Sequence, residues 1–174
     1  QTLDYIVTVV RGFYLAHLKQ ESCLIPLISN IIKEVFMSLL KEISITELSN
    51  LRIGHASDHN AQTGVTVLYF PQGAKAGCDI SGGGPASRET PLTSPVTADN
   101  PINAIVLSGG SAYGLAAADG VMNYLESQNV GYNTGAALVP LVCQSCIYDL
   151  SYGNPKVRPT ARMGEEACRQ AFAG

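Results

Sequence analysis

A serine on a glycine-rich turn is the first feature of the sequence that suggests chemistry. Residues 109–121 read GGSAYGLAAADGV and follow an apolar run, so Ser111 stands where a strand is expected to turn into a helix. Several hydrolases mount their nucleophile on such a turn, in the motif G-x-S-x-G. Gly109 precedes Ser111 correctly, but Tyr113 occupies the second glycine position and the next glycine is Gly114. The spacing is therefore one residue too long.

The partners that a serine nucleophile needs are also missing. A serine hydrolase of that fold takes its histidine from a later part of the chain. All three histidines of this chain precede Ser111, and nothing in the spacing supports a Ser–Lys pair with Lys156. A serine hydrolase that uses Ser111 is therefore kept only as an alternative.

The same turn can also act through its backbone. Gly109 and Gly110 carry no side chains that would block a ligand, and the N–H groups at a helix start can hold a carbonyl oxygen, a carboxylate or an oxyanion. A tight strand-to-helix turn packed against its neighbour needs glycine for the same steric reasons. The sequence leaves both interpretations open, and under the first we expect Gly109, Gly110 and Ser111 to bind substrate.

Two further pairs have the spacing of metal or redox sites. Cys143 and Cys146 form a C-x-x-C pair, but no second pair completes four ligands, which favours two small residues in a buried segment. His55 and His59 are four residues apart, but no glutamate follows the first as a zinc protease requires. We therefore expect no metal at either pair.

Composition restricts the class of protein. The 174 residues are 46% hydrophobic and 14% charged, which suits a folded domain with a substantial core. A formal net charge of −3 without a Lys/Arg run speaks against nucleic acid as a partner. Five cysteines without a regular framework indicate reduced thiols and a cytoplasmic location.

The chain divides into two regions of different character. In residues 1–42, apolar residues from 28 to 40 have helical spacing, and Pro26, Asn30 and charged residues make the region a poor membrane span. We interpret residues 1–42 as an amphipathic helical extension of uncertain origin. Residues 43–174 mix strands and helices, which indicates an α/β (α+β) fold.

The expected elements of the second region follow from residue patterns. β-rich and apolar runs predict strands over 63–70, 73–80 and 102–107, with a Gly/Pro/Ser-rich loop over 81–95. Residues 111–127 are expected to be helical with Ser111 as the N-cap, and residues 158–173 to form a closing helix. Arg88 and Glu89 are adjacent charges on the loop that seldom face each other, so each is expected to have a distant partner, and a solvated loop or a subunit contact is the favoured interpretation.

Four blocks of the sequence resemble one family. They read ITELSNLRIGHASD, TGVTVLYFPQGAKAGCDISGGGPASRET, NAIVLSGGSAYGLAAADGVMNYLE and IYDLSYGNPKVRPTARMGEEAC. Together they resemble the P1 family of N-terminal-nucleophile-like hydrolases, peptidase family S58, which includes L-aminopeptidase/D-esterases, β-aminopeptidases and nylon-oligomer hydrolases. The resemblance covers roughly residues 43–172 in order and without large gaps.

The resemblance implies a fold and a reaction. Family members are four-layer αββα sandwiches made as precursors that cut their own chain before a Ser or Thr. The new α-amino group then serves as base for the neighbouring hydroxyl, which agrees with the absence of any histidine after position 59. Small peptides, amides or esters are the implied substrates, without a metal or organic cofactor.

The resemblance also implies one catalytic residue in this chain. Tyr148, in the block IYDL, aligns with a tyrosine that lies beside the nucleophile in the nylon-oligomer hydrolase. Its implied role is to hydrogen-bond the amine or hydroxyl of the nucleophile and to stabilise developing charge. A buried tyrosine that donates to a backbone carbonyl is the alternative.

The family nucleophile follows a longer amino-terminal portion than this chain has. We therefore expect a truncated chain that lacks the carboxy-terminal portion bearing the nucleophile and is inactive alone. Uncovered sheet edges and an uncovered sheet face further predict self-association into a homo-oligomer, and no membrane partner is expected. A non-catalytic module that binds a small ligand at the glycine turn remains the alternative from another functional class.

Overall fold

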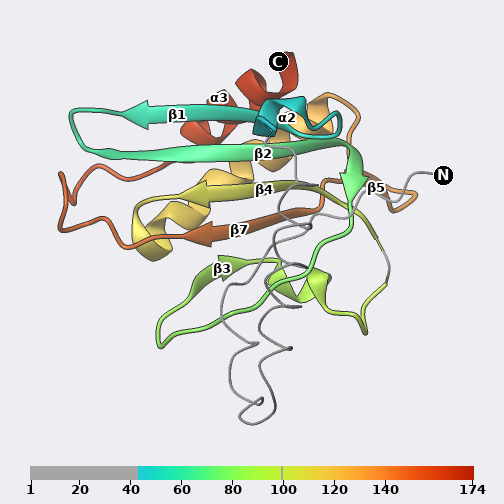
Figure 1. Cartoon of the computed structure of the whole chain (residues 1–174), viewed down its shortest axis with the longest axis horizontal. Helices are drawn as coiled ribbons and strands as arrows, with labels where there is room; N and C mark the ends of the chain where they lie inside the picture. The colour runs from blue at the N-terminus through green and yellow to red at the C-terminus, as the bar shows by residue number, and fades with distance from the viewer. Residues whose placement is uncertain (1–42, 99) are drawn as a thin grey trace, which may run out of the picture. The chain divides into compact units, whose positions relative to one another are not determined.

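The computed structural model describes residues 43–98 and 100–174 (Figure 1). The amphipathic helix expected between residues 28 and 40 lies outside the described residues. In the described part, five strands form one sheet in the order β1-β2-β4-β7-β3. The bounds of these strands are Arg52–Asp58 (β1), Thr63–Ala74 (β2), Ala86–Arg88 (β3), Ile102–Ser108 (β4) and Val142–Cys146 (β7).

The first two strands form an antiparallel hairpin that is closed by a short turn. Asp58 Oδ1 accepts hydrogen bonds from the backbone N–H groups of Asn60 and Ala61 at 3.0 and 2.9 Å, which fixes the turn. In β2, Val65 and Val67 are buried and alternate with less buried residues, as a half-buried strand requires.

A crossover connects β4 to β7, which pair in parallel. The chain leaves β4 through a 3₁₀ helix (η3, Ser111–Ala116) and continues into α2 (Ala117–Ser127). A short hairpin, β5 (Tyr132–Asn133) and β6 (Leu138–Val139), then leads into β7. After β7 the chain ends in α3 (Ala161–Ala173), where the Thr160 hydroxyl accepts the Met163 N–H as an N-cap.

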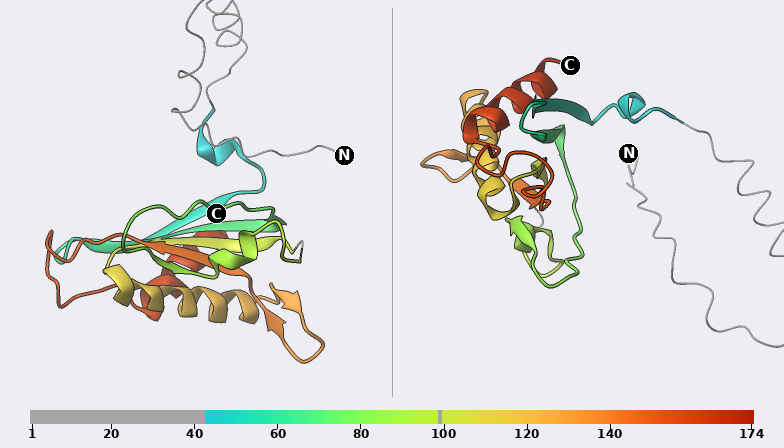
Figure 2. Two further views of the ribbon diagram at one scale, coloured as in Figure 1. Left: turned by 90° about the horizontal axis from the view of Figure 1, so that it is seen from below. Right: turned by 90° about the vertical axis from the view of Figure 1, so that its left-hand side faces the viewer.

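Both helices lie on one face of the sheet (Figures 1 and 2). Helix α3 packs on β1 and β2, and α2 packs on α3. The main core lies between the sheet and these two helices and includes Val67, Val106, Val121, Leu125 and Cys168, all completely buried.

Three glycines let these layers approach closely. A Cβ at Gly120 of α2 would lie 1.7 Å from the carbonyl oxygen of Ala161, and a Cβ at Gly164 of α3 would lie 1.9 Å from that of Ala117. In β1, a Cβ at Gly54 would lie 2.1 Å from the carbonyl oxygen of Ala167 in α3. Since backbone atoms cannot rotate away, each of these positions requires glycine.

The opposite face of the sheet is partly exposed. His55, Thr66, Leu107 and Ser145 stand opposite one another across β1, β2, β4 and β7. Leu107 keeps 46% of its surface exposed, although it lies in a central strand. Among the described residues, therefore, the α-helices cover only one face of the sheet.

The structure confirms a mixed α/β fold and corrects three local predictions. The strand expected over 73–80 is wrong, because only Gly73 and Ala74 belong to a strand, the end of β2, and of these only Ala74 has a partner, Ile102. Gly73 has a φ of 69°, and the chain beyond Ala74 leaves the sheet. The loop expected over 81–95 contains the short strand β3, whereas β1 lies in a stretch for which no strand was expected.

The structure confirms helical backbone over 111–127, as η3 followed by α2, but the prediction that Ser111 is the N-cap is wrong. Gly110 precedes the 3₁₀ helix in the cap position, and α2 begins only at Ala117. Ser111 has a φ of 54°, whereas an N-cap residue adopts an extended backbone.

No helix among the described residues is both long enough and apolar enough to cross a bilayer.

Candidate functional site

The glycine turn after β4 is held by three hydrogen bonds of its own backbone. The N–H of Gly109 donates to the carbonyl oxygen of Gly64 at 3.0 Å, and that of Gly110 to Asp149 Oδ1 at 2.6 Å. The N–H of Ser111 donates to the carbonyl oxygen of Ile147 at 3.0 Å. All three donors are thus bonded within the chain. Substrate binding at these residues stays a prediction, and the geometry gives it no free backbone donor.

The Ser111 hydroxyl forms no hydrogen bond with a candidate catalytic side chain in the described part of the chain. Within the described residues, neither a histidine nor Lys156 forms a hydrogen bond with the Ser111 hydroxyl. The serine-hydrolase alternative therefore gains no support from the geometry of the turn.

The loop that carries Tyr148 is fastened to the same turn. The N–H of Ile147 donates to the carbonyl oxygen of Ser108 at 2.9 Å, and the carbonyl oxygen of Ile147 accepts the Ser111 N–H. On the other side of Tyr148, the carboxylate of Asp149 accepts the Gly110 N–H. The structure thus brings the glycine turn and the Tyr148 loop together. Tyr148 is 69% exposed in this chain, which gives no support to the alternative of a buried tyrosine.

A hollow of about 650 Å³ lies beside the turn. It is lined by the ends of β1, β2, β4 and β7 and by the loop after β7. The lining includes carboxylates, hydroxyls, an imidazole and apolar side chains: Asp58, Asp149, Ser57, Thr63, Thr66, Ser145, Tyr152, His59, Val65, Leu107 and Ile147, with Gln62, Gly64, Ser108 and Gly109 completing it. Such a mixed lining can both orient a polar group and exclude water from an apolar one.

Asp149 is the residue of this region that the sequence interpretation missed. It directly follows Tyr148, but its partners Thr63 and Gly110 lie 86 and 39 residues away along the chain. Gly109 is the one local signal. A Cβ there would lie 1.8 Å from Asp149 Oδ2, so this glycine makes room for a carboxylate of the chain itself.

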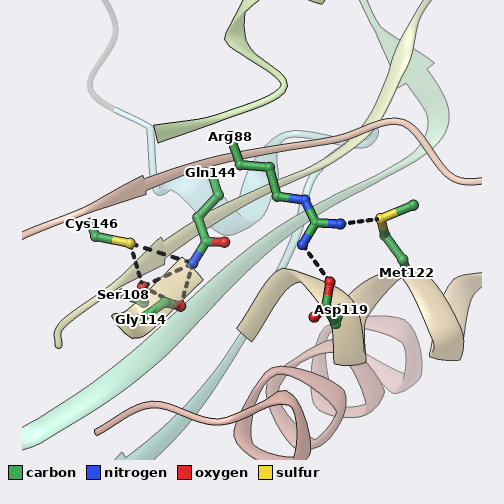
Figure 3. A network of polar contacts seen from close by, with 7 residues as sticks. All are labelled: Arg88, Ser108, Gly114, Asp119, Met122, Gln144 and Cys146. Carbon is green, nitrogen blue, oxygen red and sulfur yellow. Dashed lines mark hydrogen bonds and ion pairs between the residues drawn. The ribbon is translucent and has the colours of Figure 1, made fainter. Parts of the chain in front are cut away.

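A buried amide ties β7 to the start of η3 (Figure 3). The Gln144 side chain is 1% exposed, and its Nε2 donates to Ser108 Oγ at 2.9 Å and to the carbonyl oxygen of Gly114 at 2.8 Å. Ser108 Oγ also lies 3.2 Å from Cys146 Sγ. These contacts hold Ser108, the residue before the glycine turn, on the face of the sheet that the helices cover.

Arg88 finds its partner far away in the sequence, as expected. Its guanidinium pairs with Asp119 of α2 and contacts the sulfur of Met122, which Figure 3 also shows. The edge strand β3 is thereby joined to the helix layer.

The two cysteines of the C-x-x-C pair lie on opposite faces of β7. Cys143 packs with Phe70 and Ile102 on one side, whereas Cys146 lies beside Ser108 on the other. Burial raises the pKa of the Cys146 thiol, and the hydrogen bond with Ser108 opposes that shift. In the described ranges, no three His, Cys, Asp or Glu residues are grouped as metal ligands would be.

The thiols are expected to differ strongly in reactivity. Burial raises the pKa of Cys143 from 9.0 to about 11 and that of Cys168 from 9.0 to about 12, so little thiolate forms at pH 8. Cys78 is exposed. At pH 8, iodoacetamide should therefore modify the exposed Cys78 much faster than the buried Cys143 or Cys168. It should modify Cys143 about a hundredfold more slowly in the folded chain than in the unfolded chain, as a rise of two pKa units at Cys143 implies. Time-resolved labelling with peptide mass spectrometry measures the rates.

The same labelling in urea serves as the control. Once the chain unfolds, the rates at Cys78, Cys143 and Cys168 should converge, since the thiols then share one environment. Equal rates in the folded protein would show that the core around Cys168 is open to the reagent.

Comparisons with known proteins identify one family and several relatives. The model of the family described as peptidase family S58 matches residues 44–174. An uncharacterized aminopeptidase of Mycobacterium leprae is 42% identical over 137 residues, which are 74% of this chain and 38% of that protein. A 6-aminohexanoate-oligomer endohydrolase of Agromyces sp. is 32% identical over 135 residues, which are 77% of this chain and 35% of that protein. The chain thus spans less than two fifths of the length of these two relatives.

Proposed function

Because this chain belongs to peptidase family S58, we propose that it is part of an amide-bond hydrolase of the aminopeptidase type. Its substrates are small peptides, amides or esters. The nucleophile is a Ser or Thr outside these 174 residues, which the complete protein exposes by cutting its own chain. The observation that carries this proposal is the family match over residues 44–174, within which the structure fastens the Tyr148 loop to the glycine turn.

The proposed reaction assigns Tyr148 a specific task. The hydroxyl of the nucleophile attacks the amide carbon, and its proton passes to the α-amino group of the same residue, which then gives it to the leaving amine as the C–N bond breaks. Water attacks the resulting ester, the α-amino group takes its proton and returns one to the nucleophile oxygen, and the acid is released. The Tyr148 hydroxyl donates a hydrogen bond to the nucleophile or to the oxygen on which charge develops. Its 69% exposure supports this role, since the hydroxyl is free to face a group that another part of the protein supplies.

The exposed sheet face supports a second part of the proposal. We propose that another sheet, from a part of the complete protein outside these 174 residues, covers the face that bears Leu107, which gives the four layers of an αββα sandwich. Leu107 of the central strand β4 keeps 46% of its surface exposed, and covering that remaining surface would stabilise the protein by about 1 kcal/mol, roughly half of what full burial of a leucine contributes. The hollow beside the glycine turn would then lie between the two sheets.

The geometry favours this function over a small-ligand module at the turn. A module that binds a carboxylate through Gly109, Gly110 and Ser111 needs free N–H donors, and all three donate within the chain. No observation in the described residues favours that alternative.

The proposal is tested on the protein that carries this chain together with the segment that follows it. Intact mass and N-terminal sequencing should reveal one internal cut directly before a Ser or Thr beyond residue 174. The cut protein should hydrolyse amino-acid p-nitroanilides, whereas residues 1–174 alone should not. Hydrolysis by residues 1–174 alone that disappears in Ser111→Ala would instead establish the serine-hydrolase alternative.

A further inference from the structure

The carboxylate of Asp149 joins three strand ends at the border of the hollow. Its Oδ1 accepts the Gly110 N–H at 2.6 Å, and its Oδ2 accepts the Thr63 hydroxyl at 2.7 Å. Thr63 is the first residue of β2, Gly110 belongs to the turn after β4, and Asp149 lies in the loop after β7. One side chain therefore fixes the relative positions of three segments that are far apart in sequence.

The neighbouring glycine shows that this contact dictates the local sequence. A Cβ at position 109 would lie 1.8 Å from Asp149 Oδ2 and 2.5 Å from Thr63 Oγ1. Any other residue there would push the carboxylate away from Thr63. Gly109 is thus required by the Asp149 carboxylate, without any need for an approaching ligand.

The hydrogen bonds of Asp149 are of the strong kind. A carboxylate oxygen accepts a stronger hydrogen bond than a neutral oxygen does. When a buried donor loses its acceptor, the folded state loses stability by the whole desolvation penalty of that donor. Gly110 is buried, so its N–H would be left without a partner if Asp149 were removed.

Tyr148 lies between two anchored residues. On one side, Ile147 exchanges backbone hydrogen bonds with Ser108 and Ser111 at 2.9 and 3.0 Å. On the other side is Asp149. The backbone at Tyr148 is therefore held against the glycine turn from both directions, although the tyrosine side chain itself is exposed.

We propose that Asp149 is a positioning residue of the hydrolase site. Its hydrogen bonds to Gly110 and Thr63 hold the Tyr148 backbone in place, so that the tyrosine hydroxyl occupies a fixed position. The catalytic part of this inference rests on the proposed function. The structural part, that Asp149 holds the Tyr148 loop against the glycine turn, concerns this chain alone and is measured separately by amide hydrogen exchange.

The test compares Asp149→Ala with Asp149→Asn. The asparagine keeps an oxygen for the Gly110 N–H, and its amide can donate to the Thr63 hydroxyl, so it should rescue the arrangement that alanine loses. In the full chain, Asp149→Ala should accelerate amide hydrogen exchange at Gly110, Ser111 and Ile147 by about tenfold or more, as loss of a charged hydrogen bond implies. Asp149→Asn should stay within about threefold of the wild type.

Activity gives the second readout, in the protein that carries the nucleophile as well. Asp149→Ala should lower kcat by about tenfold to a hundredfold with KM within about twofold, because a small displacement of a catalytic group costs rate more than binding. Asp149→Asn should recover most of kcat. Asp79→Ala, which removes an exposed carboxylate bonded only to Ser81 among the described residues, is the matched control and should change neither readout.

Each remaining outcome decides the proposal. Unchanged exchange at Ser111 and Ile147 in Asp149→Ala means that the carboxylate does not hold the Tyr148 loop. A kcat as low in Asp149→Asn as in Asp149→Ala means that the charge acts directly, and the positioning role is wrong. If Asp149→Ala fails to fold, Thr63→Val, which removes one of the two bonds, is measured by the same criteria. If the wild type hydrolyses no amide, the proposed function fails, while the exchange rates still decide whether Asp149 holds the loop.

Discussion

Replacing Gly120 or Gly164 by alanine is expected to lower the free energy of unfolding by about 3 kcal/mol. The two glycines lie where α2 and α3 cross, and an added Cβ would lie 1.7 and 1.9 Å from the carbonyl oxygens of Ala161 and Ala117. Alanine is the better helix former by about 1 kcal/mol, so the steric clash must exceed that gain to destabilise the protein. Because the opposing atoms belong to the backbone, only a shift of a whole helix can relieve the contact.

Urea denaturation followed by circular dichroism measures this effect. Gly77→Ala is the matched control, because an added Cβ there meets no atom within 4 Å, and its stability should change by less than about 0.5 kcal/mol. A Gly120→Ala protein that is as stable as the wild type would show that α2 and α3 do not cross as closely as described.

Replacing Tyr148 by phenylalanine is expected to lower kcat about a hundredfold in the protein that carries the nucleophile. The change removes one hydroxyl donor and leaves the ring in place. Since the side chain is 69% exposed, the melting temperature should stay the same. Ser111→Ala should keep most of the activity, because the proposed reaction uses no atom of its hydroxyl.

The comparison of kcat/KM with melting temperature separates catalysis from stability for these variants. Tyr132→Phe, another exposed tyrosine on the β5–β6 hairpin, is the control and should behave as the wild type. Should Ser111→Ala abolish turnover while Tyr148→Phe leaves it untouched, the roles given to the two residues would have to be exchanged.

Local patterns predicted some elements well and others poorly, for identifiable reasons. β2 and β4 follow from runs of β-branched and apolar residues, and α3 from its closing amphipathic pattern. β1 escaped prediction because its inward positions are Gly54 and Ala56, which are small so that α3 can approach closely. The segment after Ala74 alternates like a strand, but no neighbouring strand pairs with it.

Some residues of the candidate site could likewise be predicted from the sequence, and others could not. Tyr148 and the glycine turn could be singled out from a resemblance between sequence blocks, and the structure shows that they are adjacent. Asp149 could not be singled out, since its significance depends on Thr63 and Gly110, which only the folded sheet brings near. A single sequence contains no signal of such distant pairing.

The three-residue strand β3 has a consequence for the order in which the sheet assembles. Arg88 pairs with Gln144, so 55 residues separate the two strands, whereas four residues close the β1–β2 hairpin. Closing the longer loop costs about 2 kcal/mol more conformational entropy, which three residue pairs and the contacts of Arg88 with Asp119 and Met122 help to offset. The hairpin should therefore form early and β3 should dock last. Until it does, the outer edge of β7 is an unpaired strand edge, which makes the interval before docking the period of greatest risk for aggregation of the nascent chain.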